Sequence, residues 1–90
     1  MVIERDIEVI NKLGLHARAA AKLVKLSAGY QSSVHLEKDG KSIDAKSIMG
    51  VLMLAASQGA RLKLTVEGDD AEQAADGIEG LFQNYFDEGE

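Results

Sequence analysis

Residues 11–21 read Asn11-Lys12-Leu13-Gly14-Leu15-His16-Ala17-Arg18-Ala19-Ala20-Ala21, and they join an alternating segment to an alanine-rich one. Gly14 can adopt the positive φ that a change of chain direction often requires. His16 then falls at or beside the first residue of a helix, and Arg18 falls in its first turn. The unpaired N–H groups and the dipole of a helix start attract anions. The stretch therefore places an imidazole beside a predicted anion site.

The residues on either side of this stretch predict seven elements. Alternation of apolar and charged side chains predicts strands, and alanine with apolar residues three or four apart predicts helices. Asp39-Gly40 is typical of a two-residue hairpin turn. In chain order, we expect a strand at 2–10, a helix at 17–28, strands at 33–37 and 41–44, a helix at 48–57, a strand at 61–67 and a helix beginning near residue 71.

The helix ends are predicted from capping residues. Gly29 follows the first helix, Ser47 precedes the second and Gly59 follows it, so we expect these three as caps. Asp69 or Asp70 is expected to cap the last helix, whose apolar side extends to Tyr85. Residues 86–90 are expected to form a frayed acidic tail.

The element order β-α-β-β-α-β-α predicts an α+β fold, with helices covering one face of an antiparallel sheet. Ninety residues suffice for one domain, so residues 1–90 are expected to form a single unit. The hydrophobic content of 46% and the charged content of 28% are those of an ordinary soluble globule. We find no internal repeat or low-complexity segment.

Composition and charge exclude several classes of function. The chain has no cysteine, which excludes disulfides and thiolate metal sites. It has no apolar run long enough for a membrane span and no signal peptide, so a cytoplasmic location is expected. Residues 1–47 carry a net charge of +2 and residues 48–90 carry −7. The overall charge of −5 argues against general nucleic-acid binding.

His16 is the main chemical candidate. An isolated histidine at a helix start is most simply a polar cap. Alternatively, a neutral imidazole there can act as a nucleophile for phosphoryl groups, and the helix N–H groups and Arg18 can hold the product. His35 is expected on the exposed face of a strand and has no partner for a metal site. The chain lacks a phosphate-binding glycine loop, so a phosphoryl group would have to come from another protein.

A second candidate region follows Ser47. Ser47 is either a simple helix cap or a regulatory phosphorylation site. The helix after it has almost no polar face, and such a short helix cannot bury every side. The first helix separately presents a basic face, with Lys22 and Lys25, that suits an acidic partner. We expect some apolar side chains of the short helix to form an exposed partner-docking patch, the alternative being a fully buried core helix. The apolar members of this patch are Ile48, Met49, Leu52 and Met53.

The sequence resembles the HPr family, the histidine-phosphorylatable phosphocarriers of the bacterial phosphoenolpyruvate-dependent phosphotransferase system. The resemblance covers the whole chain. It is carried by Gly14-Leu15-His16-Ala17-Arg18, by Lys46-Ser47-Ile48-Met49-Gly50 with Val51-Leu52-Met53-Leu54, and by Gln58-Gly59-Ala60. It implies an open-faced β-sandwich, in which three helices cover one face of a four-stranded antiparallel sheet.

The resemblance also implies roles for these residues. His16 matches the histidine that phosphorylated enzyme I modifies at Nδ1 and that then donates to IIA proteins or domains. Arg18 matches the active-site arginine. Ser47 matches the serine that HPr kinase/phosphorylase modifies in some bacteria, and the apolar residues after it match the docking surface. The implied protein is a stoichiometric carrier, not an enzyme; it needs no cofactor and is expected to be a monomer.

Three points remain open from the sequence. The family usually has proline where this chain has Ala19, a change expected to cost about 0.4–1 kcal/mol of stability. Asn11-Lys12-Leu13-Gly14 and the C-terminal end resemble a nitrogen-related branch, whereas Lys46-Ser47-Ile48-Met49-Gly50 resembles carriers controlled by serine phosphorylation. Two other functions are an RNA-binding sheet, which the lack of strand aromatics disfavours, and a regulator that docks without using His16.

Overall fold

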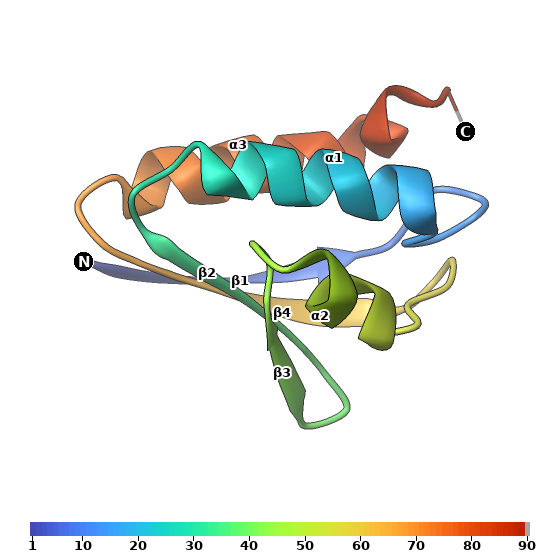
Figure 1. Ribbon diagram of the computed structural model, residues 1–90, viewed down its shortest axis with the longest axis horizontal. Coiled ribbons are helices and arrows are strands. Elements are labelled where there is room, and N and C mark those ends of the chain that lie inside the picture. The colour runs from blue at the N-terminus through green and yellow to red at the C-terminus, as the bar shows by residue number, and fades with distance from the viewer. Residues whose placement is uncertain (90) are drawn as a thin grey trace.

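The computed structural model describes residues 1–89 and shows an antiparallel sheet with helices packed on one side (Figure 1). It confirms the predicted α+β class and the predicted order of elements. The elements are β1 Val2–Glu8, α1 Ala17–Ala28, β2 Ser33–Lys38, β3 Lys41–Asp44, α2 Ile48–Met53, β4 Arg61–Glu67, α3 Ala71–Gln83 and a short turn η1 at Tyr85–Asp87.

The four strands lie in the order β1-β4-β2-β3, and every neighbouring pair is antiparallel. Ile3 pairs with Val66 across β1 and β4, and Leu36 pairs with Leu64 across β2 and β4. The register places alternate apolar residues of each strand on one face, which is the face that the helices cover. Asp39 and Gly40 both have positive φ, at 52° and 84°, which confirms the tight hairpin between β2 and β3.

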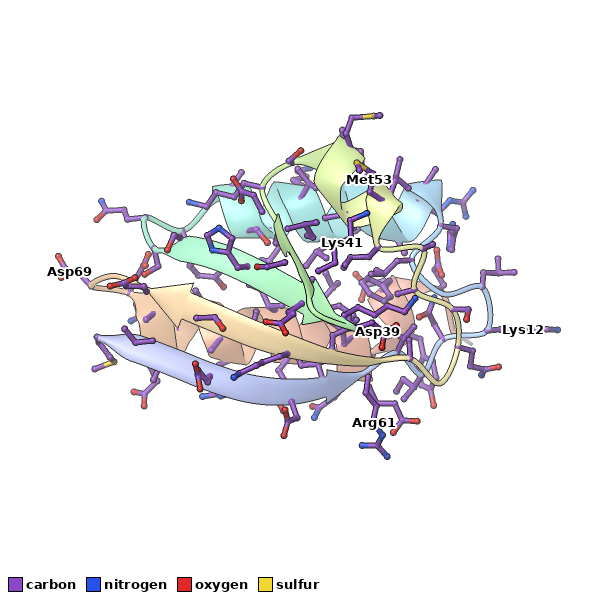
Figure 2. All side chains as sticks on the ribbon, turned by 90° about the horizontal axis from the view of Figure 1, so that it is seen from below. Lys12, Asp39, Lys41, Met53, Arg61 and Asp69 are labelled. Atoms are coloured by element: carbon purple, nitrogen blue, oxygen red, sulfur yellow. The ribbon has the colours of Figure 1, made fainter. Side chains whose placement is uncertain are left out.

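Helices α1 and α3 lie side by side over the sheet, and α2 packs beside them against α1 and β3 (Figure 1). Between these layers is a core of fully buried side chains that includes Leu23, Val34, Leu64, Ile78 and Phe82. The other face of the sheet is uncovered and carries the polar side chains of the strands, as Figure 2 shows from that side. The sandwich is therefore open-faced, as the resemblance implied.

Helix α2 is shorter than predicted. The apolar run predicted a helix to residue 57 closed by Gly59, but α2 ends at Met53 and Ala55 has a φ of 50°. The hairpin side chains explain the early end. Lys41 Nζ donates to the Met53 carbonyl oxygen at 3.3 Å, and Lys38 Nζ donates to that of Leu54 at 3.2 Å. These cations satisfy carbonyls that a longer helix would have bonded internally.

Asp70, one of the two residues predicted to cap α3, is the residue at the start of this helix, but its side chain makes no capping hydrogen bond. It instead accepts hydrogen bonds from the backbone N–H groups of Gln31 and Ser32 and from the Ser32 hydroxyl. These contacts lower the pKa of the Asp70 carboxyl below its ordinary value, the Ser32 side chain having the largest effect. Asp70 therefore ties the start of α3 to the loop between α1 and β2.

The C-terminal segment is folded, which corrects the prediction of a frayed tail; Glu90 lies outside the described residues. Tyr85, Phe86 and Asp87 have positive φ values of 56°, 53° and 61°. This left-handed turn ends α3 before Tyr85, which lies outside the helix and is partly exposed. Phe86 is fully buried, with its ring centroid 4.8 Å from that of Phe82. Burial of this ring holds the turn against the helices.

Strand β1 ends at Glu8, two residues before its predicted end, although Val9 still exchanges backbone hydrogen bonds with Gly59 and Ala60. None of the helices in residues 1–89 has the length and apolar character needed to cross a bilayer.

Candidate functional site

The loop from β1 to α1 is held in a defined turn. Gly14 has a φ of +67°, and a Cβ placed on it would lie 2.5 Å from the Ala56 carbonyl oxygen. Leu15 N–H donates to that same oxygen at 2.9 Å. The buried Asn11 side chain donates from Nδ2 to the Gly14 carbonyl at 2.8 Å. Glycine is required here by both conformation and space, and the turn sets the direction in which His16 leaves the loop.

His16 is the residue immediately before α1 and caps it. Its backbone is extended, with φ −75° and ψ 177°, and its Nδ1 lies 3.3 Å from the backbone nitrogen of Arg18. The Arg18 N–H can only donate, so Nδ1 must present its lone pair and the ring proton of neutral His16 must lie on Nε2. The predicted position of His16 at a helix start is confirmed. His16 also has the simpler of its two predicted roles, that of a polar helix cap.

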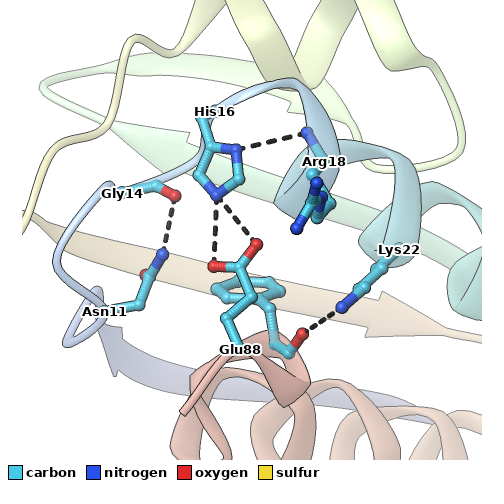
Figure 3. A network of polar contacts seen from close by, with 7 residues as sticks. Asn11, Gly14, His16, Arg18, Lys22 and Glu88 are labelled. Carbon is cyan, nitrogen blue, oxygen red and sulfur yellow. Dashed lines mark hydrogen bonds and ion pairs between the residues drawn. The ribbon is translucent and has the colours of Figure 1, made fainter. Parts of the chain in front are cut away.

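The other ring nitrogen of His16 contacts Glu88 (Figure 3). Nε2 lies 3.1 Å from Glu88 Oε1 in hydrogen-bond geometry and 2.9 Å from Oε2. Oε2 is close enough for an ion pair but is buried without hydrogen-bond geometry to any group in residues 1–89. The His16 side chain is 27% exposed and that of Glu88 is 13% exposed. The imidazole is thus reachable from solvent, but the C-terminal segment covers one of its edges.

Lys22 fixes the C-terminal segment from α1. Its Nζ donates to the Phe86 carbonyl oxygen at 2.6 Å, one α1 turn beyond Arg18 (Figure 3). Together with burial of the Phe86 ring, this bond places the segment beside the helix start. Lys22 was predicted as part of an exposed docking face, but its ammonium is engaged within the chain.

An open cleft of about 680 Å³ adjoins the ring. It is lined by Leu13, His16, Ala17, Arg18, Lys22, Asp87 and Glu88. Three of the sequence-predicted residues, His16, Arg18 and Lys22, therefore meet at one site, and the Arg18 side chain extends into it (Figure 3). Lys25 lies further along α1, outside this lining. The cleft has cationic side chains on the α1 side and carboxylates on the C-terminal side.

A second feature begins at Ser47. Its Oγ accepts a hydrogen bond from the Gly50 N–H at 3.1 Å, which confirms Ser47 as the cap of α2. Ile48, Met49, Leu52 and Met53 are exposed, whereas Val51 points into the core. Met49 and Met53 are the most open, at 65% and 58%. We call these four exposed residues the α2 patch. The prediction that they would be exposed is confirmed; their role in docking remains a prediction.

Two residues of the site were missed from the sequence. Asn11 supports the Gly14 turn, and an asparagine three residues before a glycine turn is a weak local signal for that contact. Glu88 meets His16 across a separation of 72 residues, for which no local pattern exists. His35 is exposed on β2, as expected. Within residues 1–89, the structure gathers no three His, Cys, Asp or Glu side chains that could hold a metal ion.

Comparison with known proteins identifies the family. The chain matches the family model described as "PTS HPr component phosphorylation site" over residues 3–84. It is 48% identical over 89 residues to the phosphocarrier protein HPr of Cupriavidus necator, which covers 99% of this chain and 100% of that protein. The HPr of Pseudomonas aeruginosa is 48% identical over 86 residues, 94% of this chain and 96% of that protein.

Solved structures agree with these sequence matches. A crystal structure of HPr from Thermoanaerobacter tengcongensis superposes with a TM-score of 0.93 at 45% identity, covering 96% of this chain and 97% of that one. One from Bacillus anthracis superposes with a TM-score of 0.85 at 38% identity, covering 88% and 94%. Residues 3–84, which match the family model, contain His16 at the start of α1 and the α2 patch. The chain therefore belongs to the HPr family of phosphocarrier proteins of the bacterial phosphotransferase system.

Proposed function

We propose that His16 accepts a phosphoryl group at Nδ1 from phosphorylated enzyme I and passes it to IIA proteins or domains. The observation that carries this proposal is the hydrogen bond from Arg18 N–H to Nδ1, because it requires a lone pair on that nitrogen. A nitrogen with an available lone pair beside a helix start can attack phosphorus, and the N–H groups there favour the anion that results. The protein is then a stoichiometric carrier, in keeping with its family.

The first step is an exchange of partners at phosphorus. As the Nδ1–P bond forms, the bond from phosphorus to the donor atom of enzyme I breaks, and its electron pair stays with the donor. The hydrogen bond from the Arg18 backbone N–H to Nδ1 must break, and this N–H can then donate to a phosphoryl oxygen. The Arg18 guanidinium, which lines the same cleft, supplies a second set of donors for those oxygens. The onward step reverses this exchange on the IIA partner.

The α2 patch is the surface we assign to docking. It places four exposed apolar side chains beside α1, on a helix that packs against α1 and β3. Methionine adapts its shape to different partners, which suits a carrier that must meet a donor and several acceptors in turn. Lys25 adds a positive charge on the exposed side of α1 and suits partners with acidic surfaces.

Ser47 is proposed as a regulatory phosphorylation site. Its hydroxyl stands at the start of α2 and directly before the α2 patch. A phosphate there would accept hydrogen bonds from the helix N–H groups and add negative charge to the docking surface. The enzyme that would add this phosphate is an HPr kinase/phosphorylase.

Phosphorylation by enzyme I tests the proposal. The wild-type chain, incubated with enzyme I, Mg²⁺ and phosphoenolpyruvate, is expected to gain one phosphate that is lost in acid. His16→Ala is expected to gain none, and His35→Ala is the matched control because that histidine is exposed on the distant sheet. Adding a IIA protein should discharge the label from the wild type.

Equal labelling of wild type and His16→Ala would overturn the proposal, as would an acid-stable product. A docking regulator that does not use His16 predicts a different result. In that case, His16→Ala would still control its partner, and the wild type would remain unlabelled.

A further inference from the structure

We infer that Glu88 is a positioning residue for phosphoryl transfer: its carboxylate holds the proton of His16 on Nε2 and balances the charge that the ring gains when Nδ1 is phosphorylated. This inference rests on the proposed function of His16. The structural observation behind it is that the two ring nitrogens have opposite partners, a backbone donor at Nδ1 and a carboxylate at Nε2.

The two contacts assign the same tautomer independently. Arg18 N–H donates to Nδ1 at 3.3 Å, so Nδ1 carries the lone pair. An ionised carboxylate can only accept, so Nε2, at 3.1 Å and 2.9 Å from the two Glu88 oxygens, must carry the proton. Glu88 is 13% exposed at its side chain, and water competes little for this bond. Nδ1 is thereby kept as the attacking nitrogen, as in other sites where a carboxylate orients an imidazole.

The charge balance gives Glu88 a role during transfer as well. Neutral His16 attacks through Nδ1 and loses no proton, because its single ring proton stays on Nε2. The ring therefore becomes a cation as the N–P bond forms and the donor departs with its electron pair. The Glu88 carboxylate contacts the ring that becomes this cation. A charge-assisted hydrogen bond is stronger than a neutral one, so the Glu88 contact strengthens as the phosphorylated state is reached.

Glu88 is placed by contacts that do not involve its own side chain. The left-handed turn at Tyr85–Asp87 aims it at His16, the buried Phe86 ring anchors the turn, and Lys22 holds the Phe86 carbonyl. A change at Glu88 should therefore leave the segment docked. This separates the effect of the carboxylate from the effect of losing the segment.

Three full-length variants test the inference. Glu88→Gln keeps an oxygen that can accept from Nε2–H but removes the charge, Glu88→Ala removes both, and Glu37→Gln makes the same charge change on the exposed sheet. We expect the rate of phosphate uptake from phosphorylated enzyme I to fall roughly tenfold in Glu88→Ala and less in Glu88→Gln. Glu37→Gln should match the wild type.

Nitrogen NMR of unphosphorylated His16 is the second readout, because a merely structural role would not change it. We expect a protonated, hydrogen-bonded Nε2 in the wild type and in Glu88→Gln, and a proton exposed to solvent exchange in Glu88→Ala. The Phe86 ring signals should be the same in the wild type, Glu88→Gln and Glu88→Ala, showing that the C-terminal segment stays docked. Uptake rates and His16 spectra that are equal in wild type and Glu88→Ala would overturn the inference.

The two readouts also separate this inference from the proposed function. A wild type that takes up no phosphate would defeat the proposed function, and with it the part of the inference that concerns transfer. The His16 spectra would still decide whether Glu88 holds the Nε2 proton.

Discussion

Helices α1 and α2 begin with the same device, a side chain that accepts a hydrogen bond from the first turn, yet their surroundings differ. At α1, His16 Nδ1 accepts from Arg18 N–H, and the second ring nitrogen is held by Glu88. At α2, Ser47 Oγ accepts from Gly50 N–H and stands beside the exposed α2 patch. A helix cap does not by itself distinguish the proposed phosphorylation site from the proposed docking site. The neighbouring groups do.

The largest effect on stability is expected at Gly14, which supports the loop before α1. Gly14→Ala should lower the free energy of unfolding by about 2–4 kcal/mol, because φ is +67° and the new Cβ would meet the Ala56 carbonyl oxygen and the Ser57 backbone. Denaturant titration measures the loss.

Gly40→Ala is the matched control for this change. Its φ is +84°, but no atom beyond the adjacent residues lies within 4 Å of a new Cβ, so only the conformational cost of about 1–2 kcal/mol is expected. If the two variants lost equal stability, close packing of the turn onto residues 56 and 57 would not be what holds His16 in place.

A negative charge placed at the start of α2 tests the proposed docking role of the α2 patch. Ser47→Asp should slow phosphate uptake from enzyme I by roughly tenfold, because it adds a negative charge next to the α2 patch while aspartate still caps the helix. Rates of uptake at several enzyme I concentrations measure this.

Ser47→Asn is the control, since asparagine also caps a helix but carries no charge. It should transfer at close to the wild-type rate. If Ser47→Asp and Ser47→Asn behaved alike, the charge at this helix start would not control docking.

The smallest effect is expected at the start of α3, where the Asp70 side chain bonds to another loop and not to its own helix. Hydrogen bonds from Ser32 and Gln31 lower its pKa below 3.8, so it stabilises the fold when ionised, and that contribution is lost as the pH falls through the folded value. Asp70→Asn should reduce the melting temperature by a few degrees at pH 7. The difference from wild type should shrink below about pH 4.

Asp69→Asn is the matched control, because Asp69 is the exposed neighbour. Its melting temperature should equal that of the wild type both at pH 7 and below about pH 4. A deficit of Asp70→Asn that stayed constant or grew on acidification would contradict the assignment of Asp70 as an ionised acceptor.

Local patterns predicted the regular elements well. The bounds of α1, β3 and β4 agree with the predicted ranges, and Gly29 and Ser47 are caps as expected. Alternation and alanine content act on the backbone within a few residues, so they can be read without knowledge of the fold. The same holds for His16, whose place at a helix start follows from the change of pattern around Gly14.

Local patterns therefore suffice to predict the order of the elements, the helix start beside His16 and the apolar excess that leaves the α2 patch exposed. Packing of distant segments sets where α2 ends, which groups Asp70 binds and that Glu88 contacts His16. The lysines that bond the last carbonyls of α2 come from the β2–β3 hairpin, and the turn at Tyr85–Asp87 is left-handed because burial of Phe86 compensates for its unfavourable φ values. Such contacts join residues up to 72 positions apart, and their energies exist only once the chain is packed.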